Sequence, residues 1–255
     1  MTFIKYWSLL KHLTSREIKA RYKQSFLGFL WIVLNPFCQM LIMSFVFSHI
    51  LRISNLGVPY PIFIYAGLLP WIFFQNSLSN AMSNLVENAS LVKKVYFPRE
   101  ILILSTLLAK VFDFFLSATV FILLLLYFQV KVSALWPLFL VIFAIQFLFT
   151  YGLSLLLSLG NLFYRDVQYL FNLVLTVWFY LTPVLYATEF FPVRYRWIFK
   201  FNPMSVFINA YREVILSQGQ INWGSLGIGL LLAVVVYVVS FTIFKKMEGT
   251  FADVV

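Results

Sequence analysis

Residues 101–128 read ILILSTLLAKVFDFFLSATVFILLLLYF, and this run decides the fold class. It is long enough to cross a bilayer, because a transmembrane helix needs about 20 mostly apolar residues. Pro98 stands just before the run and marks where a helix can begin, since proline inside a helix removes a hydrogen bond. Charges interrupt the run only at Lys110 and Asp113. The stretch therefore predicts a membrane-spanning helix.

The composition of the chain extends this prediction to the whole protein. Of the 255 residues, 62% are hydrophobic and 11% are charged, whereas a soluble domain carries about 25% charged residues. There are too few polar side chains to cover a water-soluble globule, so lipid must be the solvent for much of the surface. We expect an all-α membrane protein in which residues 1–255 form a single transmembrane domain.

Five further apolar stretches complete a prediction of six transmembrane helices. They lie at 29–51, 61–78, 135–159, 169–181 and 224–244. Residues 1–28 alternate cations with apolar side chains, which is typical of an amphipathic helix lying in the membrane surface, although a disordered basic start is the alternative. Residues 186–220 are mixed, and their apolar pieces are too short to cross, so we expect re-entrant or interfacial helices before the last span.

The placement of lysine and arginine predicts the orientation. With the N-terminus inside, twelve of these residues fall in cytoplasmic segments and six in external ones. The excess favours a multi-pass protein of the plasma (inner) membrane with both termini in the cytoplasm. The net charge of +10 is scattered along the chain, so we expect no nucleic-acid partner.

Motifs for catalysis are missing from the sequence. No Gly-Lys dipeptide occurs, which excludes a phosphate-binding Walker loop. The chain has no Asp-x-Asp pair, and its two histidines, His12 and His49, are far apart. We therefore expect no enzymatic site, no metal site and no cofactor bound by this chain.

Lys110 and Asp113 are the candidate intramembrane site. At a spacing of three residues they share one helix face and can neutralise each other. Lys110 lies about 18 Å along the helix from Pro98, near the middle of the membrane, where a lone charge is costly. Two interpretations stay open, a pathway or gating element and a structural pair that fixes helix packing.

Two other features are candidates for function. The aromatic content is 20%; interfacial anchoring explains most tryptophans and tyrosines, and the alternative is that some rings line a conduit and stack on sugar faces. The candidate conduit residues are Trp31, Trp71, Phe74, Trp178 and Tyr180. The polar stretch 79–99 is long for a connector and is the best candidate for contact with a soluble partner, an ordinary connector being the alternative.

Four blocks of sequence resemble the ABC-2 type polysaccharide-export permeases. These are the membrane subunits that export O-antigen, capsule or teichoic acid. The first block is LTSREIKARYKQSFLG at 13–28, followed by Trp31, Asn35 and Pro36. The others are VKKVYFPRE at 92–100, NLFYRDV at 161–167 and NPM at 202–204, in the same order and at matching spacing.

The resemblance implies a working arrangement. Two copies of the chain would form a conduit and pair with two copies of a separate ATPase subunit, which would bind ATP and Mg²⁺. A lipid-linked polysaccharide would pass between the first and fifth helices. Residues 79–99 would be the loop that docks on the ATPase, with Glu87, Lys93, Lys94 and Arg99 as contact residues. The N-terminal interface helix would carry Arg16, Glu17, Lys19 and Arg21.

Rival interpretations remain at the level of the sequence. The nearest is an ABC-2 exporter of a small drug or lipid. A membrane-embedded glycosyltransferase or acyltransferase would need clustered Asp, Glu or His residues at a membrane face, which the sequence does not offer. A structural scaffold is the third.

Overall fold

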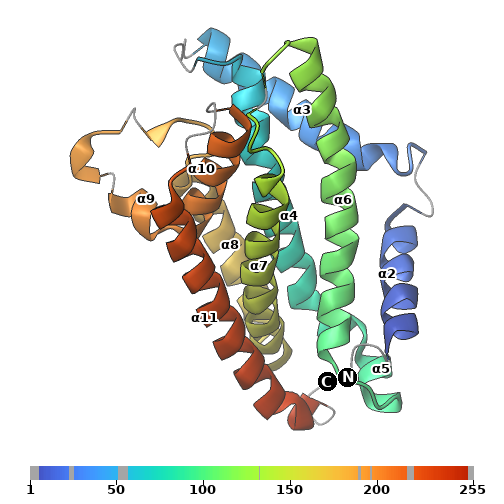
Figure 1. Cartoon of the computed structure of the whole chain (residues 1–255). Coiled ribbons are helices and arrows are strands. Elements are labelled where there is room, and N and C mark those ends of the chain that lie inside the picture. Colours follow the sequence, from blue (N-terminus) through green and yellow to red (C-terminus); the bar gives the residue numbers. More distant parts are fainter. Residues whose placement is uncertain are drawn as a thin grey trace.

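The computed structural model describes residues 6–22, 26–50, 57–131, 133–188, 191–195, 197–216 and 221–251. Every regular element within these residues is helical (Figure 1), which confirms the all-α class. The long helices are α3 (Leu30–Phe45), α4 (Tyr60–Glu87), α6 (Glu100–Tyr127), α7 (Leu138–Phe163), α8 (Asp166–Leu181) and α11 (Trp223–Met247). The other helices are α2 (Trp7–Tyr22), η1 (Val46–Ile50), α5 (Ala89–Lys94), η3 (Val193–Tyr195), α9 (Trp197–Phe201), α10 (Pro203–Leu216) and η4 (Glu248–Thr250).

Within the described ranges, five helices are long and apolar enough to cross a membrane. They are α3 with the start of η1, α4, α6, α7, and α11 with η4. Helix α8 corresponds to the predicted fifth span but has 16 residues, which is short of the roughly 20 that a span needs. The count of six spans therefore stays a prediction.

Helix α4 is the buried centre of the bundle and is longer than predicted. The prediction of a connector beginning at Ser79 is wrong in its first part, because α4 continues past Pro70 to Glu87. In this extension Asn84 faces protein rather than water, because its Nδ2 donates to Thr106 Oγ1 of α6 at 2.7 Å. The proline is supported from α7, where Gln146 Nε2 donates to Pro70 O at 2.8 Å.

Different helices lie at the two ends of the bundle. Helix α2, helix α5 and the C-terminal end of α11 lie together at one end, and α9 and α10 lie toward the other (Figure 1). Helix α10 packs against α4, α7 and α11 and is mostly buried. Residues 186–220 thus contain the predicted short helices, and their depth in a membrane stays a prediction.

A buried arginine fixes α10 to the chain after α8. The Arg212 guanidinium donates to Pro183 O and Val184 O, both at 2.6 Å, and to Phe63 O of α4 at 3.3 Å. Its carbon lies 3.6 Å from the centre of the Phe63 ring. Gly67 leaves room for it, since a Cβ there would lie 2.8 Å from Nη2. We call these contacts the arginine clamp.

The junction between α10 and α11 is polar. Asn222 caps α11 by accepting a hydrogen bond from Ser225 N at 3.0 Å, and its own N–H donates to Glu213 Oε2 at 3.0 Å. Burial raises the pKa of the Glu213 carboxyl, and the hydrogen bond from Asn222 partly opposes that shift.

Helices α7 and α11 approach each other closely at Gly152. A Cβ on Gly152 would lie 2.8 Å from Tyr237 Cα and 2.9 Å from its nitrogen, both backbone atoms that cannot rotate away. Gly152→Ala is expected to destabilise the protein by about 1–3 kcal/mol, the usual cost of overpacking, visible as a lower unfolding temperature in detergent.

The same helix offers a matched control for that substitution. A Cβ on Gly160 would meet only the Val167 side chain, at 3.5 Å. Gly160→Ala should leave the unfolding temperature unchanged or raise it, because alanine favours helix by about 1 kcal/mol over glycine. Equal loss in both variants would show that the α7–α11 approach does not limit residue size.

Candidate functional site

Helix α5 presents the predicted docking residues at the end of the bundle. Lys93 and Lys94 are exposed on its last turn, and Glu87 is exposed at the end of α4. Val92 is buried and anchors the helix to a small apolar core. Because one side of α5 is anchored and the other is open, it can offer its cations to another protein.

The first attachment of α5 comes from α2. Arg16 Nη2 donates to Asn88 Oδ1 at 2.5 Å, and Asn88 Nδ2 donates to Asn84 O at 2.9 Å. Arg16 also lies 3.7 Å from the Glu17 carboxylate. Arg16 therefore holds the α4–α5 junction to the N-terminal helix.

The second attachment comes from the end of α11. Glu248 accepts from Arg99 N at 2.7 Å and from Lys245 Nζ at 2.9 Å. Lys245 also pairs with the buried carboxylate of Glu100, at 2.7 Å. Because Arg99 and Glu100 stand at the start of α6, this network ties the segment that follows α5, and α6 with it, to the end of α11. We call this network the Glu248 latch.

Glu248→Ala is expected to loosen the latch. Hydrogen bonds to charged groups are worth about 1.5–3 kcal/mol each, and a loss of about 1.4 kcal/mol raises local opening tenfold. Amide hydrogen exchange in residues 88–99 should therefore accelerate about tenfold. Thr250→Ala, in the same short helix, removes only a hydroxyl bonded to Met247 O, so it should leave this exchange unchanged.

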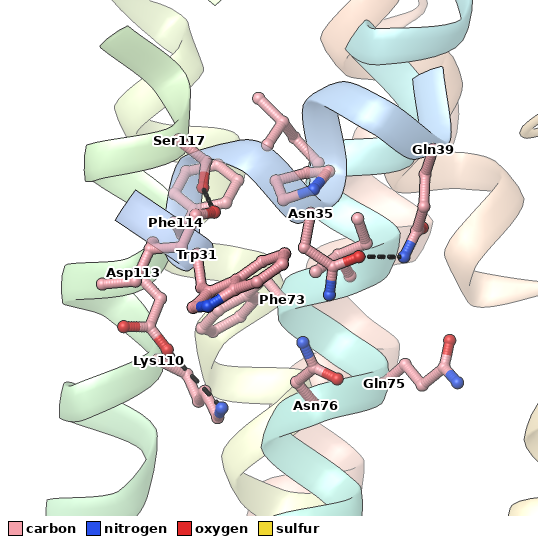
Figure 2. Close-up of a pocket in the computed structure, with 14 residues that line it drawn as sticks. Trp31, Asn35, Gln39, Phe73, Gln75, Asn76, Lys110, Asp113, Phe114 and Ser117 are labelled. Atoms are coloured by element: carbon pink, nitrogen blue, oxygen red, sulfur yellow. Dashed lines mark hydrogen bonds and ion pairs between the residues drawn. The ribbon is translucent and has the colours of Figure 1, made fainter. Parts of the chain in front are cut away.

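A polar cavity lies between α3, α4 and α6. Its volume is about 300 Å³, and Figure 2 shows the side chains that border it. Lys110 Nζ lies 3.5 Å from Asp113 Oδ2 at the α6 wall, which confirms the predicted pairing. We call it the α3–α4–α6 cavity. Its polar and aromatic lining comprises Trp31, Asn35, Gln39, Phe73, Gln75, Asn76, Lys110, Asp113, Phe114 and Ser117.

The candidate conduit aromatics fall into two groups. Trp71 and Phe74 are buried in the main core, where Trp71 packs on Phe179 and Phe74 on Trp178. The expectation that these two line a conduit is corrected, because neither ring reaches a surface of this chain. Trp178 is half-buried, whereas Trp31 and Tyr180 are 50% and 64% exposed.

Exposed polar side chains run from α3 across α4 to α8. Asn35, Asn76, Asn172 and Thr176 are exposed. Ser79 Oγ of α4 donates to Asn172 Oδ1 of α8 at 3.1 Å, and this hydrogen bond connects α4 to α8 within the surface. We call these residues, with Trp31 and Tyr180, the polar face.

The asparagines of two sequence blocks serve as connectors. Asn161 Nδ2 donates to Met82 O at 2.9 Å, and its Oδ1 accepts from Gln168 N, which fixes the α7–α8 turn to α4. Asn202 Nδ2 donates to Thr182 Oγ1 at 2.9 Å, and its Oδ1 caps α10 through Met204 N. These blocks therefore position α8 at both of its ends.

The remaining predicted residues are placed as follows. Lys19 is exposed on α2 and Glu17 is half-buried; the Arg21 side chain lies outside the described part. Sequence reasoning missed Asn88, Lys245, Glu100 and Glu248, which carry the attachments of α5. Among the described residues, no three His, Cys, Asp or Glu side chains gather closely enough to hold a metal ion.

Known proteins resemble this chain over most of its length. Residues 8–216 match the ABC-2 type transporter family. The chain is 32% identical over 250 residues to the O-antigen export system permease protein RfbA of Klebsiella pneumoniae, covering 97% of this chain and 95% of the relative. It is 33% identical over 258 residues to the RfbA protein of Myxococcus xanthus, with the same coverage. It is 21% identical over 246 residues to the polysialic acid transport protein KpsM of Escherichia coli, covering 91% of each chain.

Proposed function

The chain belongs to the ABC-2 type transporter family, and from this premise we propose that it is the permease subunit of an ATP-driven polysaccharide exporter. It moves a lipid-linked polysaccharide such as O-antigen, capsule or teichoic acid outward across the plasma membrane. Two copies form the conduit, and two copies of a separate ATPase subunit bind ATP and Mg²⁺. This chain binds neither.

The polar face is the observation that carries the proposal. Asn35, Asn76, Asn172 and Thr176 are exposed on helices of mostly apolar composition, and of these four the Thr176 hydroxyl bonds back to Asn172 O. Amides and hydroxyls that face hydrocarbon cost free energy, because lipid offers them no hydrogen bond. They are better satisfied by water, by a glycan or by a second copy of the chain. Trp31 and Tyr180, exposed beside them, supply flat surfaces for sugar rings.

Two copies facing each other through α3 and α8 place their polar faces around one passage. Helix α8 supports this arrangement, because Leu175 is its only buried residue in the described chain. Its exposed apolar side chains, such as Leu173 and Val177, are then covered by the partner copy or by lipid. Sugar hydroxyls exchange hydrogen bonds along such a lining without tight binding at any one point.

Coupling to ATP runs through α5. Closure of the ATPase pair displaces α5, and the displacement passes to α2 through Arg16 and to α6 and α11 through the Glu248 latch. Such a step needs contacts that differ between the two states. In the proposed orientation of the permease, α5 and both termini lie in the cytoplasm, and the arginine clamp lies near the outer surface of the membrane.

The experiment is co-expression with the ATPase encoded beside this chain. We expect a stable complex that hydrolyses ATP, while the purified chain alone is inactive. Cells that lack this chain should accumulate lipid-linked polysaccharide inside, and the wild-type chain should restore surface polysaccharide. Surface polysaccharide that is unchanged in the deletion strain would refute the proposal.

A further inference from the structure

The α3–α4–α6 cavity opens onto the polar face. Asn35 and Asn76 belong to both the cavity wall and the exposed surface, so they form its rim. Lys110 is 8% exposed and lies at the deeper wall with Asp113. A molecule in the proposed passage therefore has direct access to the cavity from the side.

The charges that border the cavity balance. Among the residues that the structure describes, Lys110 and Asp113 are the charged members of its lining, and they pair at 3.5 Å. A phosphate or carboxylate that entered would meet the Asp113 carboxylate, and an organic cation would meet the Lys110 ammonium. Neither sign of charge is favoured inside a medium of low dielectric constant. The lining therefore selects uncharged molecules.

The other polar groups require a ligand rich in hydrogen-bonding groups. Four amides, those of Asn35, Gln39, Gln75 and Asn76, line the cavity together with the Ser117 hydroxyl. Each amide has two donor hydrogens and an acceptor oxygen. Gln39 donates one hydrogen to Asn35, Gln75 accepts from Trp71, and Ser117 Oγ donates to Ile32 O, so the amides keep further donors and acceptors for a ligand. An acyl chain would leave the remaining amide donors and acceptors without partners, at a cost of about 1–3 kcal/mol for each one that it buries.

The size and shape of the cavity restrict the possible ligands further. At about 300 Å³ the cavity stands at the small end of ligand sites, and it suits one ring rather than a chain. Phe73, Phe114 and the Trp31 ring supply flat apolar surface. Hydroxyl groups around a compact ring with apolar C–H faces satisfy both kinds of lining.

We propose that the α3–α4–α6 cavity is a binding site for a single uncharged sugar ring, a lateral subsite of the conduit in each copy. This proposal rests on the proposed function, since the bound sugar ring is one residue of the polysaccharide that is being exported. The Lys110–Asp113 pair hydrogen-bonds the ring hydroxyls and excludes charged sugars. The site accordingly favours glycans that contain neutral residues over polymers of acidic sugars only.

The test measures protection of a cysteine placed in the cavity. Cys38 is the single cysteine of the chain, so Cys38→Ser/Ile72→Cys carries one thiol in the cavity lining. Cys38→Ser/Thr176→Cys carries one thiol on the polar face outside it. The complex with its ATPase is placed in lipid nanodiscs, and the rate of alkylation by N-ethylmaleimide is followed with methyl glucoside or with glucuronate.

Methyl glucoside is expected to slow alkylation of the Ile72→Cys thiol about threefold at about twice its dissociation constant. Glucuronate should have no effect, and the Thr176→Cys thiol should react equally under all conditions. Adding Lys110→Met/Asp113→Leu replaces the pair by apolar side chains of similar size and should remove the protection. ATP hydrolysis by the complex reports that each variant is folded. Cys38→Ser/Ile32→Cys is a second reporter, at an apolar position of the lining.

Three results would overturn the subsite. They are absence of protection at both reporter positions, equal protection by glucuronate, and protection that survives loss of the charge pair. Each leaves the proposed function standing if the same complex still exports polysaccharide in cells. Failure of export by the wild-type complex would remove the proposed function whatever the protection experiment gives.

Discussion

Reversing both lysines of α5, in Lys93→Glu/Lys94→Glu, is expected to abolish export while the protein still folds and inserts. Both side chains are exposed on the last turn of a helix held by Val92 beneath them, so the bundle does not depend on their charge. A docking partner that accepts two cations would instead meet two carboxylates, and such like-charge contacts cost several kcal/mol. Surface polysaccharide and co-purification of the ATPase measure the effect.

Two controls separate charge from disturbance. Lys93→Arg/Lys94→Arg keeps both cations and should preserve export. Lys131→Glu reverses an exposed lysine beyond the far end of α6 and should also export normally. Export by the double glutamate variant at the wild-type level would remove α5 from the coupling step.

Loss of the arginine clamp is expected to have the largest effect on stability. Arg212→Met removes three hydrogen bonds to carbonyl oxygens and leaves Pro183 O and Val184 O buried beside α10. Breaking one side of a buried charged interaction costs about 3–5 kcal/mol. We expect a much lower unfolding temperature in detergent, low expression and loss of export.

A graded series tests the geometry of the clamp. Arg212→Lys keeps the charge but lacks the planar fork that contacts two carbonyls at once, so its stability should fall between those of Arg212→Met and the wild type. Arg194→Met removes an exposed arginine at the same end and should be neutral. A lysine variant as stable as the wild type would mean that charge alone, and not the fork, holds α10.

Parts of the fold were predictable because the deciding residues are neighbours in sequence. Helix α6 begins at Glu100 and ends at Tyr127, within one residue of the apolar run, since lipid tolerates little polarity along that length. The predicted bounds of α4 end too early, because Asn84 and its polar neighbours resemble a connector in the sequence. In the structure Asn84 bonds to α6 and Ser79 bonds to α8. The spacing of apolar residues in the sequence cannot distinguish a polar residue that faces water from one that faces protein.

The same reasoning explains what was found and missed in the site. The Lys110–Asp113 pair could be predicted from the sequence because its members are three positions apart on one helix. The Glu248 latch joins Arg99 to a residue 149 positions away, and the α2 attachment joins residues 72 positions apart. No local pattern marks such partners. Residues 186–220 were ambiguous for a related reason, since Arg212 fixes them through contacts with α4 and with the chain after α8.

The shortness of α8 has a consequence for the surrounding lipid. Sixteen residues at about 1.5 Å each give a helix about 24 Å long, against a hydrocarbon layer of about 30 Å. Wherever this helix meets lipid, the bilayer must thin to match it, at a fraction of a kcal/mol for each ångström. On the expectation that α8 is the fifth span, we expect the acyl-chain length of the host membrane to affect this protein: short chains relieve the mismatch, and long chains favour states in which α8 is withdrawn from lipid.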